Sequence, residues 1–409
     1  MFPTTLLTTL LLALSVAANP VLVDRSPVTL PISRRLNLTS VHNLVRHDQT
    51  RAKTLKLRGS ARSGLDDRAV INEAVDNQAV TYVASVGVGS PATTYSLLID
   101  TGSSNTWVGA GKAYVKTSTS VQTSNRVAVT YGSGSFSGTE FTDTVNLASG
   151  LTLTKQSIGV ASRSTGFDGV DGILGIGPVA LTEDTLSPAT SSLIPTVTDN
   201  AFSQGIITSN LIGISFEPTT TEEIVNGELT WGGTDSSKFT GSISFISKTT
   251  TSPASEFWGI NQSIRYGASN TILATTAGIV DTGTTLVLIA TNAFTKYRTA
   301  TGGVLDNNTG LLRLTSTQFS NLQSLFFIAG GATFELTANA QLFPRSLNTD
   351  IGGTAGSIYL IVNDLGSNSG EGLDFINGYT FLERFYSVFD TANKRVGFAT
   401  TPFTTATTN

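Results

Sequence analysis

The stretch LLIDTGSSNTW, residues 97–107, ends an apolar run on one aspartate, which small and hydroxyl-bearing residues follow. A second stretch, IVDTGTT at 279–285, repeats this arrangement. Each is followed by a matching apolar–apolar–Gly segment, DGILGIG at 171–177 and DFINGYTFL at 374–382. Because the same order occurs twice, we expect a duplicated lobe whose two acid loops meet at a pseudo-twofold axis.

The two acids of these loops, Asp100 and Asp281, predict a pair of carboxylates at the lobe interface. Two carboxylates about 3 Å apart cannot both ionise easily, so one pKa rises and the pair shares a proton. One acid can then act as general base on a water, while its protonated partner hydrogen-bonds a substrate carbonyl. A single Asp-Thr-Gly is a common turn, and only the paired occurrence favours this chemistry.

Three pairs of neighbouring residues fit the same interpretation. Glycines let backbone N–H groups approach the carboxylates, and hydroxyls can donate to their outer oxygens. A pair of threonines can hydrogen-bond across the interface and hold the two loops rigid. These pairs are, in that order, Gly102 and Gly283, Ser103 and Thr284, and Thr101 and Thr282.

The residues that the chain lacks narrow the chemistry further. It has no cysteine, which excludes zinc–thiolate sites, thiol nucleophiles, redox pairs and disulfides. Its two histidines, His42 and His47, both precede the expected mature chain, so the body offers neither Ser-His-Asp catalysis nor a histidine metal site. Catalysis by carboxylates, with no metal and no cofactor, is among the few enzymatic mechanisms that remain.

The amino-terminal segment divides by composition. Residues 1–18 have the pattern of a signal peptide, with an apolar core too short to span a bilayer, so we expect a secreted, extracellular protein. Residues 19–68 hold ten of the 25 lysines and arginines but four of the 29 acids, which leaves fifteen basic and 25 acidic residues elsewhere, a net charge of −10. Such a basic segment could be a nucleic-acid arm. In a secreted chain, a removable prosegment that docks by charge is the better interpretation.

The rest of the 409-residue chain is long enough for two lobes and has a strand-rich composition. Charged residues make up 13% of the sequence, about half the usual share. Alternating apolar patterns predict strands, with two short helices at 292–300 and 316–325 that Asn292 and Ser316 would cap. We therefore expect a mainly β fold. Its expected lobes are an N-terminal one at 69–240 and a C-terminal one at 241–409.

Several motifs together point to one family. They are DTGSSNTWV, YGSGSFSG, DGILGIG, LTWGGTDSSKFTG, IVDTGTT and FYSVFDTANKRVGFA. With them, residues 82–399 resemble the pepsin-like aspartic endopeptidases (peptidase family A1), and among these the secreted fungal enzymes of the polyporopepsin type. The resemblance implies two β-barrel-like lobes with a cleft between them for an extended peptide. The shared proton is an established property of that family rather than a deduction from this sequence.

The resemblance also implies a role for individual positions. Asp100 and Asp281 match the catalytic pair. Tyr131 matches the aromatic residue of a flap that closes over substrate, and Trp107 the residue that supports this tyrosine. The other positions that match substrate contacts are Gly132 and Ser133 at the flap tip, Ile173 in an apolar pocket, and Gly102, Gly283, Thr284 and Thr285 beside the substrate main chain.

The implied partners follow from the same family. They are protein or peptide substrates in extended conformation, pepstatin-like inhibitors, and the chain's own prosegment as an intramolecular inhibitor. In pepsin zymogens a prosegment lysine lies on the catalytic pair, so Lys53 or Lys56 is expected there. We expect no cofactor, no metal, no nucleic acid and no membrane partner, and a monomer that prefers large apolar residues around the cut bond.

Two departures from the family pattern concern the second apolar–apolar–Gly segment. Asn377 stands where relatives have an apolar residue, and Tyr379 stands where many pepsins have an acid. The family's three disulfides are also absent. Because both acid loops are intact, we still expect activity, and the departures bear on pH optimum and lobe packing.

Three Asn-x-Ser/Thr sequences are glycosylation candidates: Asn37, which would leave with the prosegment, Asn261 and Asn307. Two other classes of protein compete with the endopeptidase. A non-catalytic binding protein on the same fold predicts loss of one aspartate, and the sequence keeps both. An acid glycosidase would also use two carboxylates, but such enzymes do not usually place them in duplicated Asp-Thr-Gly loops.

Overall fold

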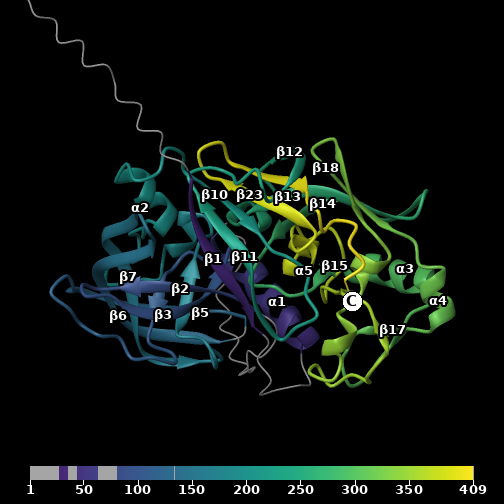
Figure 1. Ribbon diagram of the computed structural model, residues 1–409, viewed down its shortest axis with the longest axis horizontal. Coiled ribbons are helices and arrows are strands. Elements are labelled where there is room, and N and C mark those ends of the chain that lie inside the picture. The colour runs from purple at the N-terminus through teal and green to yellow at the C-terminus, as the bar shows by residue number, and fades with distance from the viewer. Residues whose placement is uncertain (1–26, 36–43, 63–80, 133, 409) are drawn as a thin grey trace, which may run out of the picture.

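The structure is a computed structural model that describes residues 27–35, 44–62, 81–132 and 134–408 (Figure 1). The expected signal segment, 1–18, lies outside these residues. Within them, no helix combines the length and the apolar character needed to cross a membrane.

The expected mainly β, bilobal fold is confirmed, and the strands of the described chain form three sheets. The largest sheet, in spatial order, contains β12 (Thr240–Ser247), β24 (Arg395–Thr400), β23 (Phe385–Asp390), β10 (Leu211–Ser215), β11 (Glu223–Trp231), β1 (Val28–Arg35), β2 (Thr81–Val88), β3 (Thr93–Asp100), β8 (Gly172–Gly175), β4 (Trp107–Val108), β7 (Leu151–Thr165), β6 (Ser135–Ala148), β5 (Val121–Thr130) and β9 (Leu186–Ser187). The second contains β19 (Ala332–Leu336), β18 (Leu325–Ala329), β13 (Gly259–Tyr266), β14 (Asn270–Val280), β22 (Phe375–Asn377), β15 (Val287–Ile289) and β21 (Val362–Asp364). The third contains β16 (Val304–Leu305), β17 (Leu312–Leu314) and β20 (Ile358–Tyr359).

Helices are short, apart from one near the amino terminus. The α-helices are α1 (Leu44–Arg62), α2 (Val197–Ser203), α3 (Thr291–Thr301), α4 (Ser316–Ser320) and α5 (Tyr379–Leu382). The 3-10 helices are η1 (Val179–Thr182), η2 (Ala254–Glu256), η3 (Asn339–Gln341) and η4 (Arg345–Leu347).

The sequence repeat corresponds to a repeated strand arrangement. In the N-terminal lobe, β3 runs parallel to β8, and β4 pairs antiparallel with the other edge of β8. In the C-terminal lobe, β14 runs parallel to β22, and β15 pairs antiparallel with β22. Each acid therefore lies at the end of a strand that is paired with its own apolar–apolar–Gly segment. This parallel pairing explains why both strands are apolar without alternation, since both of their faces are covered.

The basic amino-terminal segment, which sequence patterns left without secondary structure, forms a strand and a helix inside the fold. Strand β1 is inserted between β11 and β2 in the largest sheet, and α1 follows beside it (both purple in Figure 1). Ile32 of β1 is 1% exposed and Leu55 of α1 is 3% exposed, and both belong to the main apolar core. The described parts of the segment, residues 27–35 and 44–62, are thus packed into the molecule.

A buried ion pair fixes the end of β1. The Nε atom of Arg34, which is 1% exposed, lies 3.2 Å from a carboxylate oxygen of Glu383, and the Tyr82 hydroxyl donates to the same oxygen at 3.0 Å. Burial raises the pKa of Glu383, while the Arg34 guanidinium opposes that shift. A carboxylate of the body therefore has its cation supplied by the amino-terminal segment.

The two expected helices exist, but their amino-terminal caps differ from those predicted, and the second ends at Ser320, since Leu325 begins β18 instead. Helix α3 begins after Ala290, not at Asn292. Helix α4 is capped by Thr315, whose hydroxyl accepts the N–H of Gln318 while the Gln318 side chain accepts the N–H of Thr315. This reciprocal pair is a capping box. It places the amino-terminal cap at Thr315 rather than Ser316, because its two side chains satisfy two N–H groups that have no partner within the helix.

Glu140 gives a test of pH-dependent stability. It lies on β6 at 2% exposure, and its one side-chain hydrogen bond among the described residues comes from the Ser157 hydroxyl at 2.6 Å. Burial raises the pKa of Glu140 from 4.5 to about 7. An acid whose pKa is raised on folding favours the folded state at low pH, and this contribution is lost as pH rises from 4.5 to about 7.

We therefore expect Glu140→Gln to flatten the fall in stability across that range. The wild-type-minus-variant difference in unfolding free energy should change by on the order of 3 kcal/mol between pH 4 and pH 8. Urea unfolding of both proteins at a series of pH values measures this difference. The change with pH is the readout, because the Gln side chain alters absolute stability by itself. Parallel profiles for the two proteins would contradict the assignment.

Candidate active site

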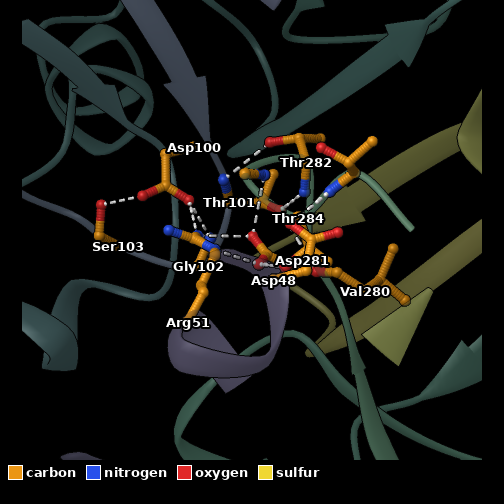
Figure 2. A network of polar contacts seen from close by, with 12 residues as sticks. Asp48, Arg51, Asp100, Thr101, Gly102, Ser103, Val280, Asp281, Thr282 and Thr284 are labelled. Carbon is orange, nitrogen blue, oxygen red and sulfur yellow. Dashed lines mark hydrogen bonds and ion pairs between the residues drawn. The ribbon is translucent and has the colours of Figure 1, made fainter. Parts of the chain in front are cut away.

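The two acids of the repeated loops lie side by side at the junction of the lobes. Asp100 is the last residue of β3 and Asp281 directly follows β14, and both side chains are fully buried. Figure 2 shows the two carboxylates on either side of the Arg51 guanidinium, which enters from α1. The tertiary structure thus brings together two residues that are 181 positions apart.

Each carboxylate accepts the same set of hydrogen bonds from its own loop. Asp100 accepts from the Ser103 hydroxyl at 2.5 Å and from the Gly102 N–H at 2.8 Å. Asp281 accepts from the Thr284 hydroxyl at 2.5 Å and from the Gly283 N–H at 3.0 Å. These bonds hold both side chains in fixed orientations, and they stabilise the ionised form of each acid.

The threonines next to the acids hydrogen-bond across the interface in a reciprocal pattern. The Thr101 N–H donates to the Thr282 hydroxyl at 3.0 Å, and the Thr282 N–H donates to the Thr101 hydroxyl at 2.9 Å. Each hydroxyl then donates to a carbonyl of the opposite lobe, that of Val280 for Thr101 and that of Ile99 for Thr282. The four bonds fix one loop against the other (Figure 2).

Glycine is needed at two positions because the loops approach so closely. A Cβ atom on Gly102 would lie 2.7 Å from Oδ1 of Asp281. A Cβ atom on Gly283 would lie 2.7 Å from Oδ1 of Asp100. Any side chain at either position would push the opposite carboxylate away.

The cation on the two acids is Arg51, so the expectation of Lys53 or Lys56 there is wrong. One Nη atom of Arg51 lies 2.5 Å from Asp100 and 2.9 Å from Asp281, and Nε lies 2.7 Å from Asp281. On a helix, Lys53 is turned about 200° from Arg51, and it is exposed. Lys56 instead contacts Ser367 and Glu371. Without a predicted helix, the sequence could not choose among these three cations.

The two acids differ in their protonation behaviour. Burial raises the pKa of Asp100, and the neighbouring Asp281 carboxylate opposes the lowering effect of Arg51. Burial also acts to raise the pKa of Asp281, but its two contacts with Arg51 and its bond from Thr284 hold that pKa below the usual value. With Arg51 in place, a shared proton therefore favours Asp100.

Helix α1 occupies the space above the acids through other contacts as well. The buried Asp48 carboxylate accepts the N–H of Thr285 at 3.3 Å and that of Leu286 at 2.7 Å. A Cβ atom on Gly132 would lie 2.0 Å from the Cα atom of Arg51, so the flap backbone packs directly on the helix. The helix thus fills the position between the acids and the flap.

The carboxy-terminal half of α1 is held by acids of both lobes. Arg62 lies 2.7 Å from Glu183 and 3.5 Å from Glu256, and Lys56 pairs with Glu371. Sequence patterns predicted none of these contacts. A helical spacing of Arg51, Leu55, Arg58 and Arg62 was the available signal, since these residues repeat at four-, three- and four-residue intervals.

The expected flap and pocket residues form one apolar cluster. Tyr131, Trp107 and Ile173 are all buried in it, together with Phe136 and Phe167. The Trp107 ring stacks on Phe136 at 4.2 Å and meets Phe167 edge-on at 4.9 Å, and Tyr131 meets Phe167 edge-on at 5.4 Å. The flap tyrosine and the tryptophan are thus linked through two phenylalanines. The flap-tip residue at position 133 lies outside the described residues.

Among the described residues, no three or more His, Asp or Glu side chains cluster in a way that could hold a metal ion. Apart from the Arg51 guanidinium, the polar groups that converge on the site are carboxylates, hydroxyls and backbone N–H groups. Such a set can polarise a water and a carbonyl by proton transfer and hydrogen bonding.

Comparison with known proteins agrees with this geometry. Residues 81–401 match the family model described as eukaryotic aspartyl protease, so the chain belongs to that family and is a pepsin-like aspartic endopeptidase. Over 333 residues it is 74% identical to polyporopepsin of Irpex lacteus, covering 81% of this chain and 98% of that protein. Pepsin A of Sus scrofa is 27% identical over 405 residues, covering 93% of this chain and 97% of the relative.

A solved structure extends the likeness to three dimensions. The crystal structure of an aspartic proteinase from Irpex lacteus superposes with a TM-score of 0.81 at 64% sequence identity. The match covers 94% of this chain and all of that one. The family resemblance read from the sequence is thereby confirmed.

Proposed function

We propose that the protein is a secreted acid endopeptidase made as a zymogen, with Asp100 and Asp281 as its catalytic pair. The observation that carries this proposal is the guanidinium of Arg51, which contacts both carboxylates while β1 and α1 occupy the fold. A cation on both acids blocks the place where an attacking water must lie. The segment that contains it, residues 19–68, therefore acts as an inhibitory prosegment.

Catalysis begins once this segment has left. The ionised member of the pair removes a proton from a water, and the protonated member hydrogen-bonds the carbonyl oxygen of the peptide bond. The water oxygen attacks the carbonyl carbon to form a tetrahedral intermediate. Its carbon–nitrogen bond then breaks as the proton taken from the water passes to the leaving nitrogen. Bonds from Ser103, Thr284 and the two loop glycines keep both acids oriented throughout.

The substrate lies where α1 lies in the precursor, between the flap and the acids. The N–H of Thr285 donates to Asp48 in the precursor. Once α1 has left, it becomes free to bind the main chain of an extended peptide. Tyr131 and Ile173 belong to an apolar cluster at the edge of this space, which favours large apolar side chains beside the cut bond. Burying one such side chain contributes roughly 1.5–3 kcal/mol, enough to select among sites.

Secretion and glycosylation complete the proposal. The apolar pattern of residues 1–18 supports export. Asn261 and Asn307 are both exposed, so either could carry a glycan in a secreted protein. Self-cleavage near Arg68–Ala69 separates the prosegment from an N-terminal lobe that begins at residue 69 and a C-terminal lobe that begins at residue 241.

The proposed function is tested by acidifying the purified precursor. Below about pH 5, where ordinary carboxylates begin to protonate, we expect a new amino terminus near residue 69 and pepstatin-sensitive cleavage of denatured haemoglobin. Mass spectrometry identifies the terminus, and the protease assay measures activity. A mature terminus upstream of Arg46, or an unprocessed precursor with full activity, would refute the zymogen proposal.

Specificity at the flap gives a further prediction. Ser133 is neutral, and a hydroxyl cannot offset the cost of desolvating a lysine ammonium, so we expect poor cleavage after lysine. Ser133→Asp should raise the relative rate after lysine by about tenfold or more, since a charge-assisted hydrogen bond contributes roughly 1.5–3 kcal/mol. Profiling both enzymes on a peptide library measures this ratio.

The matched control is Ser135→Asp, which adds the same charge to the same flap. The Ser135 hydroxyl faces Thr165 at 3.3 Å, so this variant should leave the lysine ratio unchanged. Strong cleavage after lysine by the unmodified enzyme would show that another acid already serves the pocket.

A further inference from the structure

Two buried amides form a closed pair beside the strand that carries Asp281. Asn377, the last residue of β22, is fully buried, and Gln262 of β13 is 1% exposed. The Gln262 amide donates to the Asn377 side-chain oxygen at 3.0 Å, and the Asn377 amide donates back to the Gln262 oxygen at 3.0 Å. The order of strands is β13–β14–β22, so the pair ties together the two strands that flank β14.

Asn377 also contacts the acid loop through its backbone. Its carbonyl accepts the N–H of Asp281 at 3.1 Å. The parallel ladder between β14 and β22 is only two residues long, so this bond lies at its very end. Just beyond it, the Tyr379 N–H donates to Thr284 at 2.9 Å and the Thr380 hydroxyl donates to Thr285 at 2.8 Å. The segment that begins at Asn377 therefore bonds to the acid loop at Asp281, Thr284 and Thr285.

The other lobe shows that the fold itself does not need an amide here. In the repeat, DGILGIG aligns with DFINGYT, which places Leu174 at the position of Asn377. Leu174 is fully buried in the apolar core. A buried amide that loses its partner is costly, whereas replacing both partners by apolar groups can be nearly neutral for stability. The amide pair thus supplies two directional hydrogen bonds that fix the strands relative to each other, which an apolar contact would not do.

We propose that Asn377 and Gln262 are positioning residues for the reaction, because their amide pair fixes the end of β22 and thereby the backbone of Asp281. The inference rests on the proposed catalytic role of Asp281. Neither amide touches substrate. The pair acts through the N–H···O=C bond of Asp281 and sets where that carboxylate stands relative to Asp100.

A double-substitution series separates positioning from mere stability. Gln262→Leu and Asn377→Leu should each lower both thermal stability and kcat, because each leaves one buried amide unpaired. The double variant should recover most of the stability but keep kcat about tenfold below wild type with little change in KM, since small misplacements of reacting groups cost rate. Exchanging the two residues, Gln262→Asn with Asn377→Gln, retains an amide pair and should restore kcat.

The control is a buried amide away from the acids. Gln341 is fully buried and bonds to Tyr297 and to backbone carbonyls, so Gln341→Leu should lose stability without a matching loss of kcat. A double leucine variant with wild-type kcat would overturn the proposal, and so would an exchanged pair that stays as slow as the double variant. If the wild-type enzyme itself cleaved no peptide, the proposed function would fail instead.

Discussion

Asp100→Asn and Asp281→Asn enzymes are each expected to lose kcat/KM by at least about 10³-fold, because neither acid can supply both the base and the acid of the reaction. The fold should persist in both variants. Asparagine has the same shape, and its oxygen can still accept from the Ser103 or Thr284 hydroxyl that each carboxylate now contacts. Cleavage of a fluorogenic peptide measures the rate, and circular dichroism with thermal melting checks the fold.

Asp171→Asn is the matched control for these variants. The Asp171 carboxylate accepts the N–H of Ser96 at 2.8 Å and lies on the segment paired with β3, but it belongs to neither acid loop. It should therefore keep most of the wild-type rate. An Asp281→Asn enzyme with more than a small percentage of wild-type activity would contradict the two-carboxylate mechanism.

Removing the charge of Arg51 should release the inhibition of the precursor. Breaking a buried ion pair by removing one partner costs about 3–5 kcal/mol, and here that cost falls on the docked state of α1. The open, active form of an Arg51→Ala precursor should therefore be populated about 150- to 5,000-fold more than in wild type. Peptide cleavage by the unprocessed precursor at pH 6, and its affinity for pepstatin, both measure this population.

Lys53→Ala provides the comparison for Arg51. Lys53 is an exposed cation two residues further along the same helix, so its loss changes the net charge equally without touching the acids. That precursor should remain latent. If Arg51→Ala were as latent as Lys53→Ala, the close packing of α1 against Gly132 and, at Gly59, against Pro253 would be enough to block the cleft without the ion pair.

The two acid loops show how much of a site local sequence can predict. The sequence Asp-Thr-Gly followed by hydroxyl-bearing residues occurs twice. Each copy specifies the hydrogen bonds of its own carboxylate, because each donor lies within three residues of its acceptor. The pseudo-twofold axis then requires the two threonines to meet, since equivalent residues of a duplicated lobe face one another. The mainly β fold was also predicted from local sequence, through its alternating apolar patterns.

The partners of the amino-terminal segment could not be predicted in this way. Arg51 contacts an acid 230 positions away, and Arg34 pairs with Glu383, which directly follows α5. Both pairings depend on how a helix or strand is rotated when it docks. A lysine two residues from Arg51 has the same charge but faces solvent.

Local sequence patterns were enough to predict the two acid loops, their internal hydrogen bonds, the two-lobed β fold and a basic segment ahead of an acidic body. The cation that reaches the acids, the carboxylates that hold α1 and the pairing of Asn377 with Gln262 became known only from the three-dimensional arrangement. The difference lies in the distance along the chain between the residues in contact. A repeated motif encodes contacts within a few residues or across a symmetry axis, whereas side chains on unrelated elements meet only after burial has fixed the position and rotation of each element.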